Sequence, residues 1–187
     1  MKNLKLYMVM LGCRPKGRFT EQHDIFFGIG ENLKDLIPKM KAFWPEAKGK
    51  IHIDVWREVT VVDNYNIEIV LKSDESASEN QLYFINLGGY KENEFEEFHY
   101  KILAVGKEIS DAVKKSKQTT FYKHCGFKGA TSHVDDKFGV DVDDLYNVKE
   151  ILELDLKEKF GLKITKSDVE LAEDELHIGY LKLEKIL

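Results

Sequence analysis

The sequence predicts an α+β protein built from two tandem strand–strand–helix–strand–strand repeats, with a largely antiparallel sheet. Two observations predict this class. Short apolar segments alternate with turns rich in glycine, proline and polar residues, which is typical of strands joined by tight connections. A stretch near the N-terminus also returns in mid-chain, which indicates an internal duplication. We expect the two copies to pack together with approximate two-fold pseudo-symmetry, because about 75 residues make a marginal core on their own.

The duplication rests on two blocks in the same order. Residues 6–43 align with 82–119 at an offset of 76 residues and share 11 identities in 38 positions. A later block, which begins at residue 52, aligns at an offset of 81 residues. The matched polar residues are Glu21 with Glu97, His23 with His99, His52 with His133, and Asp54 with Asp135. Strand propensity does not favour these residue types, so two similar but unrelated strands would not explain the matches.

The repeats set the expected domain boundaries. The first repeat covers residues 1–71, and the second covers 81–151. The segment KSDESASEN at 72–80 has no large apolar residue and is the natural linker. Residues 152–187 have no counterpart in the first copy and are expected to pack on the repeats as a C-terminal extension.

The first copy should contain four strands and one helix. Apolar runs predict strands over 4–11 and 22–29, and apolar residues at helical spacing predict a helix over 31–43. Pro38 should kink or restart that helix. A strand over 50–62 should place Ile51, Ile53 and Val55 on one face, with its hairpin partner over 65–71.

The second copy repeats the first strands at 81–87 and 98–105 and the helix at 107–122. Residues 133–142 are strand-like but acidic. A helix is predicted over 148–160, with Gly161 as its C-terminal stop. The segment 175–183 should form a closing strand.

Composition excludes several function classes. The net charge of −5 gives no general attraction to nucleic acid or to anionic membranes. The apolar stretch at the N-terminus is short and lacks a small-residue cleavage site, so we do not interpret it as a signal peptide. Two cysteines cannot form a disulfide framework, and a cytoplasmic location is the default. No cofactor is predicted, and a homodimer is left open.

Several motifs resemble an uncharacterised bacterial family, known as domain of unknown function 1543, which occurs in one or two copies per chain. They are MLGCRPKGRFTEQHDIFFGIG, LKDLIPKMKAFWPEA, INLGGY with FEEFHYKILAV, and FYKHCGFKGA with HVDDKFGVDVDD. The resemblance covers roughly residues 6–151. It implies no activity and no catalytic residue.

Paired histidines and carboxylates are the first candidate site. Residues two apart on a strand share a face, so Glu21 projects with His23, and His52 projects with Asp54. If the strands are neighbours, two imidazoles and two carboxylates converge. That set suits a divalent metal or a general acid–base pair, but it equally suits a structural cross-strand pairing. The second copy offers the same pattern in Glu97, His99, His133 and Asp135.

A cationic loop is the second candidate site. Arg14, Lys16 and Arg18 lie with two glycines between residues 12 and 18, and this composition can hold a phosphate or a carboxylate. The equivalent loop of the second copy, 88–94, is not basic. An ion pair between the two halves, with acidic residues at 135–136 or 141–144, would explain the cations equally well, and so would plain solvation.

The sequence therefore leaves two functions open. The first is a cytoplasmic binding or interaction module that recognises a small anionic ligand or a partner protein through Arg14, Lys16 and Arg18. The alternative is a metal-dependent or acid–base enzyme that uses Glu21, His23, His52 and Asp54. Nothing in the sequence decides whether the chain is an enzyme.

Overall fold

A computed structural model describes residues 3–75, 78–119 and 144–186. The chain divides into two compact units, of which the first joins residues 1–75 to 152–187 and the second comprises 76–151. The fold is α+β, as predicted, and all pairings between the described strands are antiparallel. Within the described residues, no helix is long and apolar enough to cross a membrane.

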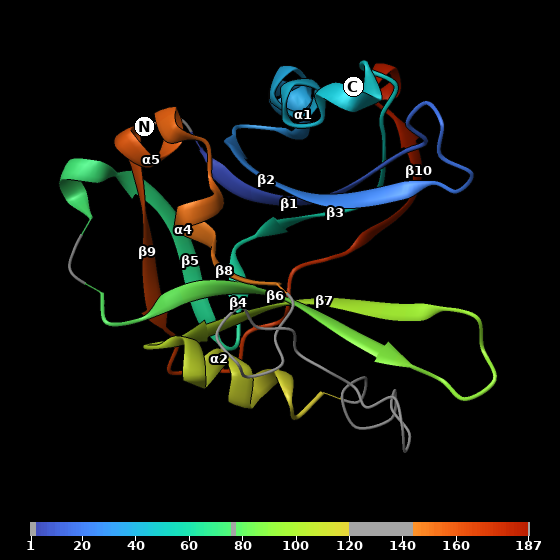
Figure 1. The fold of residues 1–187 in the computed structure, drawn as a ribbon. Helices are drawn as coiled ribbons and strands as arrows, with labels where there is room; N and C mark the ends of the chain where they lie inside the picture. Colours follow the sequence, from blue (N-terminus) through green and yellow to red (C-terminus); the bar gives the residue numbers. More distant parts are fainter. Residues whose placement is uncertain (1–2, 76–77, 120–143, 187) are drawn as a thin grey trace. The chain divides into compact units, whose positions relative to one another are not determined.

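A four-stranded sheet forms the centre of the first unit, with strand order β10-β3-β1-β2 (Figure 1). Its strands are β1 (Lys5–Cys13), β2 (Gln22–Gly30), β3 (His52–Val59) and β10 (His177–Lys182). The first three strands correspond to predicted ones. The fourth comes from the far end of the chain, so the C-terminal extension supplies one edge of the first unit's sheet.

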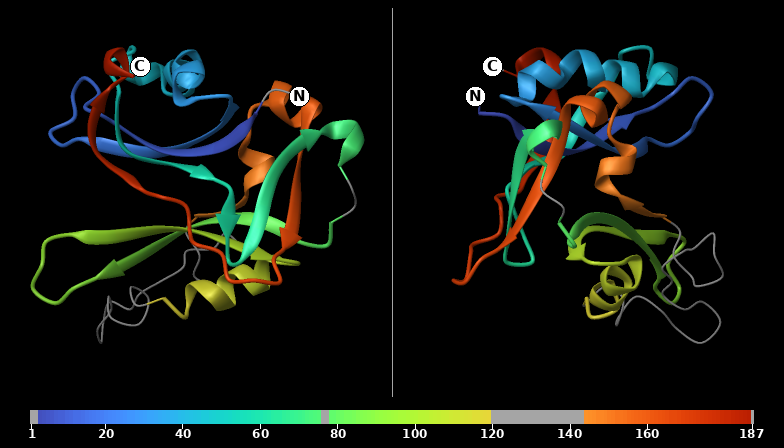
Figure 2. Two further views of the ribbon diagram at one scale, coloured as in Figure 1. Left: turned by 180° about the vertical axis from the view of Figure 1, so that it is seen from behind. Right: turned by 90° about the vertical axis from the view of Figure 1, so that its left-hand side faces the viewer.

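One face of this sheet carries the main core of the first unit. Tyr7, Val9, Leu11 and Cys13 alternate along β1 and are all buried in one cluster. They are covered by η1 (Leu33–Leu36), α1 (Ile37–Phe43) and η2 (Pro45–Ala47), and α1 lies along one face of the sheet in each view of Figures 1 and 2. Pro38 stands at the start of α1, where its missing N–H is not needed, so the helix restarts there.

A second sheet of the first unit has the order β4-β5-β9. Its strands are β4 (Val61–Val62), β5 (Tyr65–Leu71) and β9 (Phe160–Lys166). The turn between β4 and β5 places both Asp63 and Asn64 at positive φ, which suits a tight hairpin. The strand predicted over 50–62 was expected to pair with 65–71. The chain bends at Thr60, so only β4 forms this hairpin with β5.

The predicted helix over 148–160 is broken at 152–153 and ends at Lys159, one residue before a strand. The structure has α4 (Val148–Ile151), α5 (Leu154–Lys159) and then β9, so Gly161 lies in a strand and does not stop a helix. A β-carbon at position 161 would lie 2.5 Å from Cδ of Glu75, so the glycine allows that side chain to pack against the strand. Two short 3-10 helices complete the first unit, η3 (Lys72–Asp74) and η4 (Leu183–Lys185).

The second unit has a three-stranded sheet with the order β7-β6-β8. Its elements are β6 (Gln81–Tyr90), β7 (Glu97–Gly106), α2 (Ile109–Ser116), β8 (Asp144–Asn147) and α4. A capping box between Glu108 and Asp111 sets the start of α2. Its core gathers Tyr83, Ile85, Leu87, Ala104 and Ala112. The strand expected at 133–142 lies outside the described residues.

The two long hairpins have the same register. Leu6 pairs with Ile29 and Leu82 with Val105, so β6 and β7 repeat the pairing of β1 and β2 at the predicted offset of 76 residues. The third strands match differently. In the first unit Val55 pairs with Met10, and in the second Asp144 pairs with Asn86, the equivalent of Met10. The third strands are therefore related by an offset of 89 residues (55 to 144) and not by the predicted 81. The two-fold arrangement of complete repeats stays a prediction.

Asp174 fastens the bend between β3 and β4. Its carboxylate accepts hydrogen bonds from the backbone N–H groups of Thr60 at 2.8 Å and Val61 at 2.9 Å, from the Thr60 hydroxyl, and from Arg57 at 3.2 Å. The Asp174 side chain is only 10% exposed, so these donors have little access to water.

Replacing Asp174 by alanine should therefore destabilise the protein by about 2–4 kcal/mol, because it leaves the backbone N–H groups of Thr60 and Val61 without this acceptor and removes the nearer carboxylate from Arg57. Urea denaturation followed by circular dichroism measures the loss. Glu173→Ala is the matched control, since Glu173 is 62% exposed and reaches Arg57 only at 3.6 Å. Equal losses in the two variants would contradict the assigned role of Asp174.

Tyr7 should make the protein sensitive to alkali. Burial, together with the Glu58 carboxylate 3.3 Å from its hydroxyl, raises the pKa of Tyr7 to about 12. An unfolded tyrosine ionises near pH 10, so this contribution to stability is complete below about pH 10 and is lost as the pH rises towards about 12. Between about pH 8 and about pH 11, we expect the wild type to lose about 1–2 kcal/mol of unfolding free energy through Tyr7, and Tyr7→Phe not to lose it. Urea denaturation at the two pH values measures this difference. Tyr65→Phe should keep the wild-type loss, and an unchanged loss in Tyr7→Phe would assign it to another group.

Candidate functional site

The candidate site lies on the sheet face of the first unit opposite the α1 core. Gly12 in β1 pairs with His23 in β2 on one side and with His52 in β3 on the other. The convergence was predicted on the condition that the two histidine strands are neighbours. They are not, because β1 lies between them. The residues His52, Gly12 and His23 form a row across three strands.

Gly12 leaves the space in which the flanking side chains meet. A β-carbon at position 12 would lie 2.5 Å from Nε2 of His52 and 2.5 Å from Oδ2 of Asp54. Any other residue would occupy the position that these side chains now share. A glycine inside a strand often marks such a close approach, and this is the sequence signal that could have predicted the site's centre.

A β-bulge directs Asp54 towards the same point. On β1 the pairing passes from Met10 with Val55 to Leu11 with Ile53, and skips Asp54. β10 is also irregular here, since its pairing passes from Ile178 to Leu181. Gly179, in that interval, has a φ of +139°, which favours glycine. Bulges commonly redirect side chains at functional sites.

The same bulge corrects the predicted face of Val55. The alternation predicted Ile51, Ile53 and Val55 on the core face, and the first two are buried there. Beyond the bulge the alternation changes, so Val55 pairs with Met10 while Trp56 packs against the core cluster.

The four predicted side chains do converge. Nε2 of His52 lies 3.1 Å from Oε1 of Glu21 and 3.4 Å from Oδ1 of Asp54. Nε2 of His23 lies 3.3 Å from Oδ2 of Asp54 and 3.9 Å from Oε2 of Glu21. Each imidazole thus faces both carboxylates, and each carboxylate spans the two rings. We call these four residues the His–carboxylate cluster.

The cluster contains buried polar atoms that the protein does not satisfy. The His52 side chain is only 10% exposed, while Glu21 and His23 are nearly half exposed. Nε2 of His52 and Oδ2 of Asp54 are buried and form no hydrogen bond with any described residue, despite their short distances to neighbouring charged groups. Buried polar atoms are normally hydrogen-bonded, so these two atoms keep a hydrogen-bonding capacity that the described residues do not use.

Tyr180 from β10 covers His52 and was not predicted. Its ring lies 4.3 Å from the imidazole, measured between centroids, at an interplanar angle of 36°. A similar contact joins His177 of the same strand to Trp56, at 3.9 Å and 14°. No local pattern indicates these contacts, because they depend on which strand pairs with β3.

The cluster contains ligand types that suit transition metals, two imidazoles and two carboxylates. Among the described residues, however, no group of three or more His, Cys, Asp and Glu side chains is arranged to hold a metal ion. As they stand, the four side chains are placed to share protons with one another and with a bound molecule. Cys13 does not join them: it is buried on the core face, and burial raises the pKa of its thiol, to which Glu21 and Glu46 add.

The cationic loop lies at the outer end of the β1–β2 hairpin. The side chains of Arg14, Lys16 and Arg18 are all exposed and make no hydrogen bond or ion pair with a described residue. The acidic residues proposed to pair with them, at 135–136 and 141–143, lie outside the described part of the chain. Within the described residues, the loop therefore presents three cations on an exposed hairpin end.

The second unit repeats half of the cluster. His99 pairs with Gly88 as His23 pairs with Gly12. Glu97 accepts a hydrogen bond of 2.8 Å from the hydroxyl of Tyr90, which occupies the position of Arg14. His133 and Asp135 lie outside the described residues. Of the second set of four, the structure therefore describes only Glu97 and His99.

A groove of about 570 Å³ in the first unit lies elsewhere. Its lining is mostly apolar and comes from the start of β1 and from β3, β4, β5 and β9. No residue of the His–carboxylate cluster lines it. Among the described residues, four buried side-chain atoms lack a hydrogen bond, and two of them, Nε2 of His52 and Oδ2 of Asp54, meet in the cluster. The other two, Nε of Arg57 and Oδ1 of Asn86, lie outside both the cluster and the groove. We therefore place the candidate site at the cluster.

Replacing Gly12 by alanine should displace His52 and Asp54, because the new β-carbon would overlap both. We expect a loss of about 1–3 kcal/mol, as for other overpacked sites. The control is the same substitution in a His52→Ala/Asp54→Ala background, where space is available and the loss should nearly vanish. Denaturation midpoints of the four proteins measure this, and equal losses in both backgrounds would show that Gly12 does not serve as the spacer.

Comparisons with known proteins give a similar fold and a partial family match. The chain is similar in fold to the crystal structure of protein Il1583 from Idiomarina loihiensis, with a TM-score of 0.60 and 19% sequence identity. That similarity covers 96% of this chain and 98% of the other. No curated protein matches the chain.

A family model also matches part of the first unit. The matched stretch is residues 18–69, which include all four residues of the His–carboxylate cluster. Over this stretch the chain is similar to the family described as Domain of Unknown Function (DUF1543), and the resemblance predicted from the sequence is confirmed there.

Proposed function

We propose that the first unit binds a small polar molecule at the His–carboxylate cluster and exchanges protons with it. The observation that supports this proposal is the pair of buried, unpaired atoms, Nε2 of His52 and Oδ2 of Asp54. Leaving such atoms unpaired costs about 1–3 kcal/mol each. A ligand that pairs with both atoms would recover this free energy.

The carboxylates determine the ligand class. Glu21 and Asp54 accept hydrogen bonds and repel anions, so the cluster favours a molecule that carries N–H or O–H donors or a positive charge. The small anion predicted from the sequence was assigned to the cationic loop and not to this cluster. Acid–base chemistry at an imidazole is the reaction that the cluster could supply to such a molecule.

The four residues would have different roles. His52, which is buried and held against the Tyr180 ring, suits the donor or acceptor of the proton. Asp54, whose Oδ1 lies 3.4 Å from Nε2 of His52, suits the residue that holds the ligand's donor beside this nitrogen. Glu21 and His23 form the exposed rim, where a ligand enters and makes its first contacts.

Binding of small fragments tests this proposal. We expect amines, amides and alcohols to shift the ¹⁵N and ¹³C ring signals of His52 and His23 in NMR spectra, and carboxylates and phosphates to leave them unchanged. Asp54→Asn should weaken binding of the amines at least about tenfold, because it removes the charge and keeps the shape. The control Asp24→Asn changes a carboxylate on the opposite face, beside Leu11, and should bind normally.

Two results would oppose the proposal. If the amines bind Asp54→Asn as well as the wild type, the cluster is not their site. If the purified protein contains a stoichiometric transition metal that is lost in His52→Ala, the cluster is a metal centre, and the free acid–base mechanism is wrong.

The cationic loop supports a separate proposal, that Arg14, Lys16 and Arg18 bind an acidic partner. The three side chains are exposed and unpaired with any described residue. They lie on an exposed hairpin end, so an acidic surface on a protein suits them better than a small anion.

A further inference from the structure

The two long hairpins end in the same turn. Arg18 N–H donates to the Pro15 carbonyl at 3.2 Å, and Glu94 N–H donates to the Lys91 carbonyl at 3.3 Å. These pairs are related by the offset of 76 residues that relates the hairpins. Gly17 and Asn93 hold the equivalent left-handed position, with φ of +85° and +64°. The backbone thus presents equivalent side chains at the ends of both hairpins.

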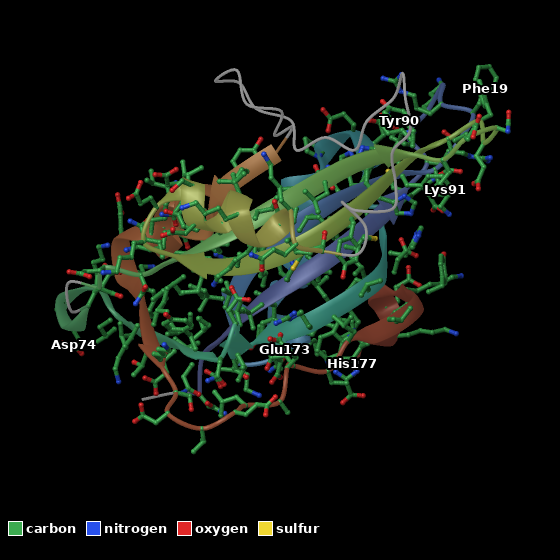
Figure 3. The ribbon with its side chains drawn as sticks, turned by 90° about the horizontal axis from the view of Figure 1, so that it is seen from below. Phe19, Asp74, Tyr90, Lys91, Glu173 and His177 are labelled. Atoms are coloured by element: carbon green, nitrogen blue, oxygen red, sulfur yellow. The ribbon has the colours of Figure 1, made fainter. Side chains whose placement is uncertain are left out.

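Each turn is followed by a fully exposed phenylalanine. Phe19 and Phe95 occupy equivalent positions and both rings are completely open to solvent. Figure 3 shows Phe19 at the outer end of its hairpin, directed away from the sheet. One exposed apolar ring is ordinary, but two at matched positions indicate a surface that becomes covered.

The charges around the two rings are opposite. Lys16 corresponds to Glu92 and Arg18 to Glu94, and the four side chains are exposed and make no ion pair or hydrogen bond with a described residue. The basic tip, residues 14–20, carries three cations. The acidic tip, residues 91–96, carries three glutamates and one lysine. The two tips therefore have the same shape and complementary charge.

We propose that the basic tip of one copy of this chain docks on the acidic tip of a second copy. The two phenylalanine rings would cover each other, while Lys16 and Arg18 face Glu92 and Glu94. Tips of the same charge would repel, so the pairing is between unlike tips. In a dimer with two-fold symmetry this contact forms twice, since each copy offers both tips.

The association should be weak and sensitive to salt. A contact between two hairpin tips is well below the roughly 1,000 Å² of a stable interface, even when it forms twice. Exposed ion pairs lose most of their strength when the Debye length falls from about 10 Å to about 3 Å. We expect a micromolar dimer that dissociates between about 0.1 M and about 1 M salt.

Charge reversal tests the docking in the full chain. Lys16→Glu/Arg18→Glu makes both tips acidic, and Glu92→Lys/Glu94→Lys makes both tips basic. Each variant alone should be monomeric in sedimentation velocity, at concentrations where the wild type dimerises. An equimolar mixture of the two should form a heterodimer, because every tip then meets an opposite one. The chain with all four substitutions should dimerise again.

Further variants separate the apolar and charged parts of the contact. Phe19→Ser and Phe95→Ser should each weaken dimerisation at least about tenfold, because each removes a ring that the contact would cover. Lys41→Glu/Lys50→Glu reverses two exposed charges away from the tips, and its dimer should match the wild type.

Three outcomes would overturn the inference. The first is a wild type that stays monomeric at several hundred micromolar protein in low salt. The second is a mixture of the two charge-reversed variants that stays monomeric, which would mean that the tips do not bridge two copies. The third is a dimer that persists in both reversed variants, which would place the interface elsewhere.

Discussion

The first unit depends on one missing side chain in its central region, that of Gly12 in β1. On one face of that strand, Val9, Leu11 and Cys13 are fully buried beneath α1. On the other face, the empty position at Gly12 lets His52 and Asp54 reach towards His23 from a strand that is not its neighbour. A single strand thus holds the hydrophobic core on one side and a group of titratable side chains on the other. The core keeps the strands in register, and the register brings the four polar side chains together.

The C-terminal segment completes both the fold and the site. Asp174 fixes the bend after β3 by four hydrogen bonds, and a few residues later β10 pairs with β3 itself. The irregular pairing around Gly179 lies beside the bulge at Asp54, and Tyr180 from the same interval covers His52. The site is therefore assembled from residues more than 150 positions apart in sequence. Its geometry depends on the docking of the final strand as much as on the hairpin that contains Gly12.

The sequence predicted what local periodicity encodes. The strands β1 and β2, the restart of the helix at Pro38, and the shared face of His52 and Asp54 follow from spacing and from proline geometry. The face of Val55 was predicted wrongly because the bulge depends on how β3 pairs with β1, and the alternation of apolar residues along β3 alone does not indicate it. Gly161 was mistaken for a helix stop because the contact that explains it is with Glu75, far away in sequence. The cover of His52 by Tyr180 was missed for the same reason, since it depends on strand order.

The two hairpins show how equal backbones come to hold different chemistry. In the second unit, the position of Arg14 is occupied by Tyr90, whose hydroxyl donates to Glu97 at 2.8 Å. In the first unit, Arg14 makes no such bond with a described residue, and Glu21 lies 3.1 Å from His52. The equivalent carboxylate thus accepts a hydrogen bond from a tyrosine in one hairpin and faces an imidazole in the other. The register, the glycine and the histidine are the same in both hairpins, so the difference between the two copies comes from side chains placed on a common frame.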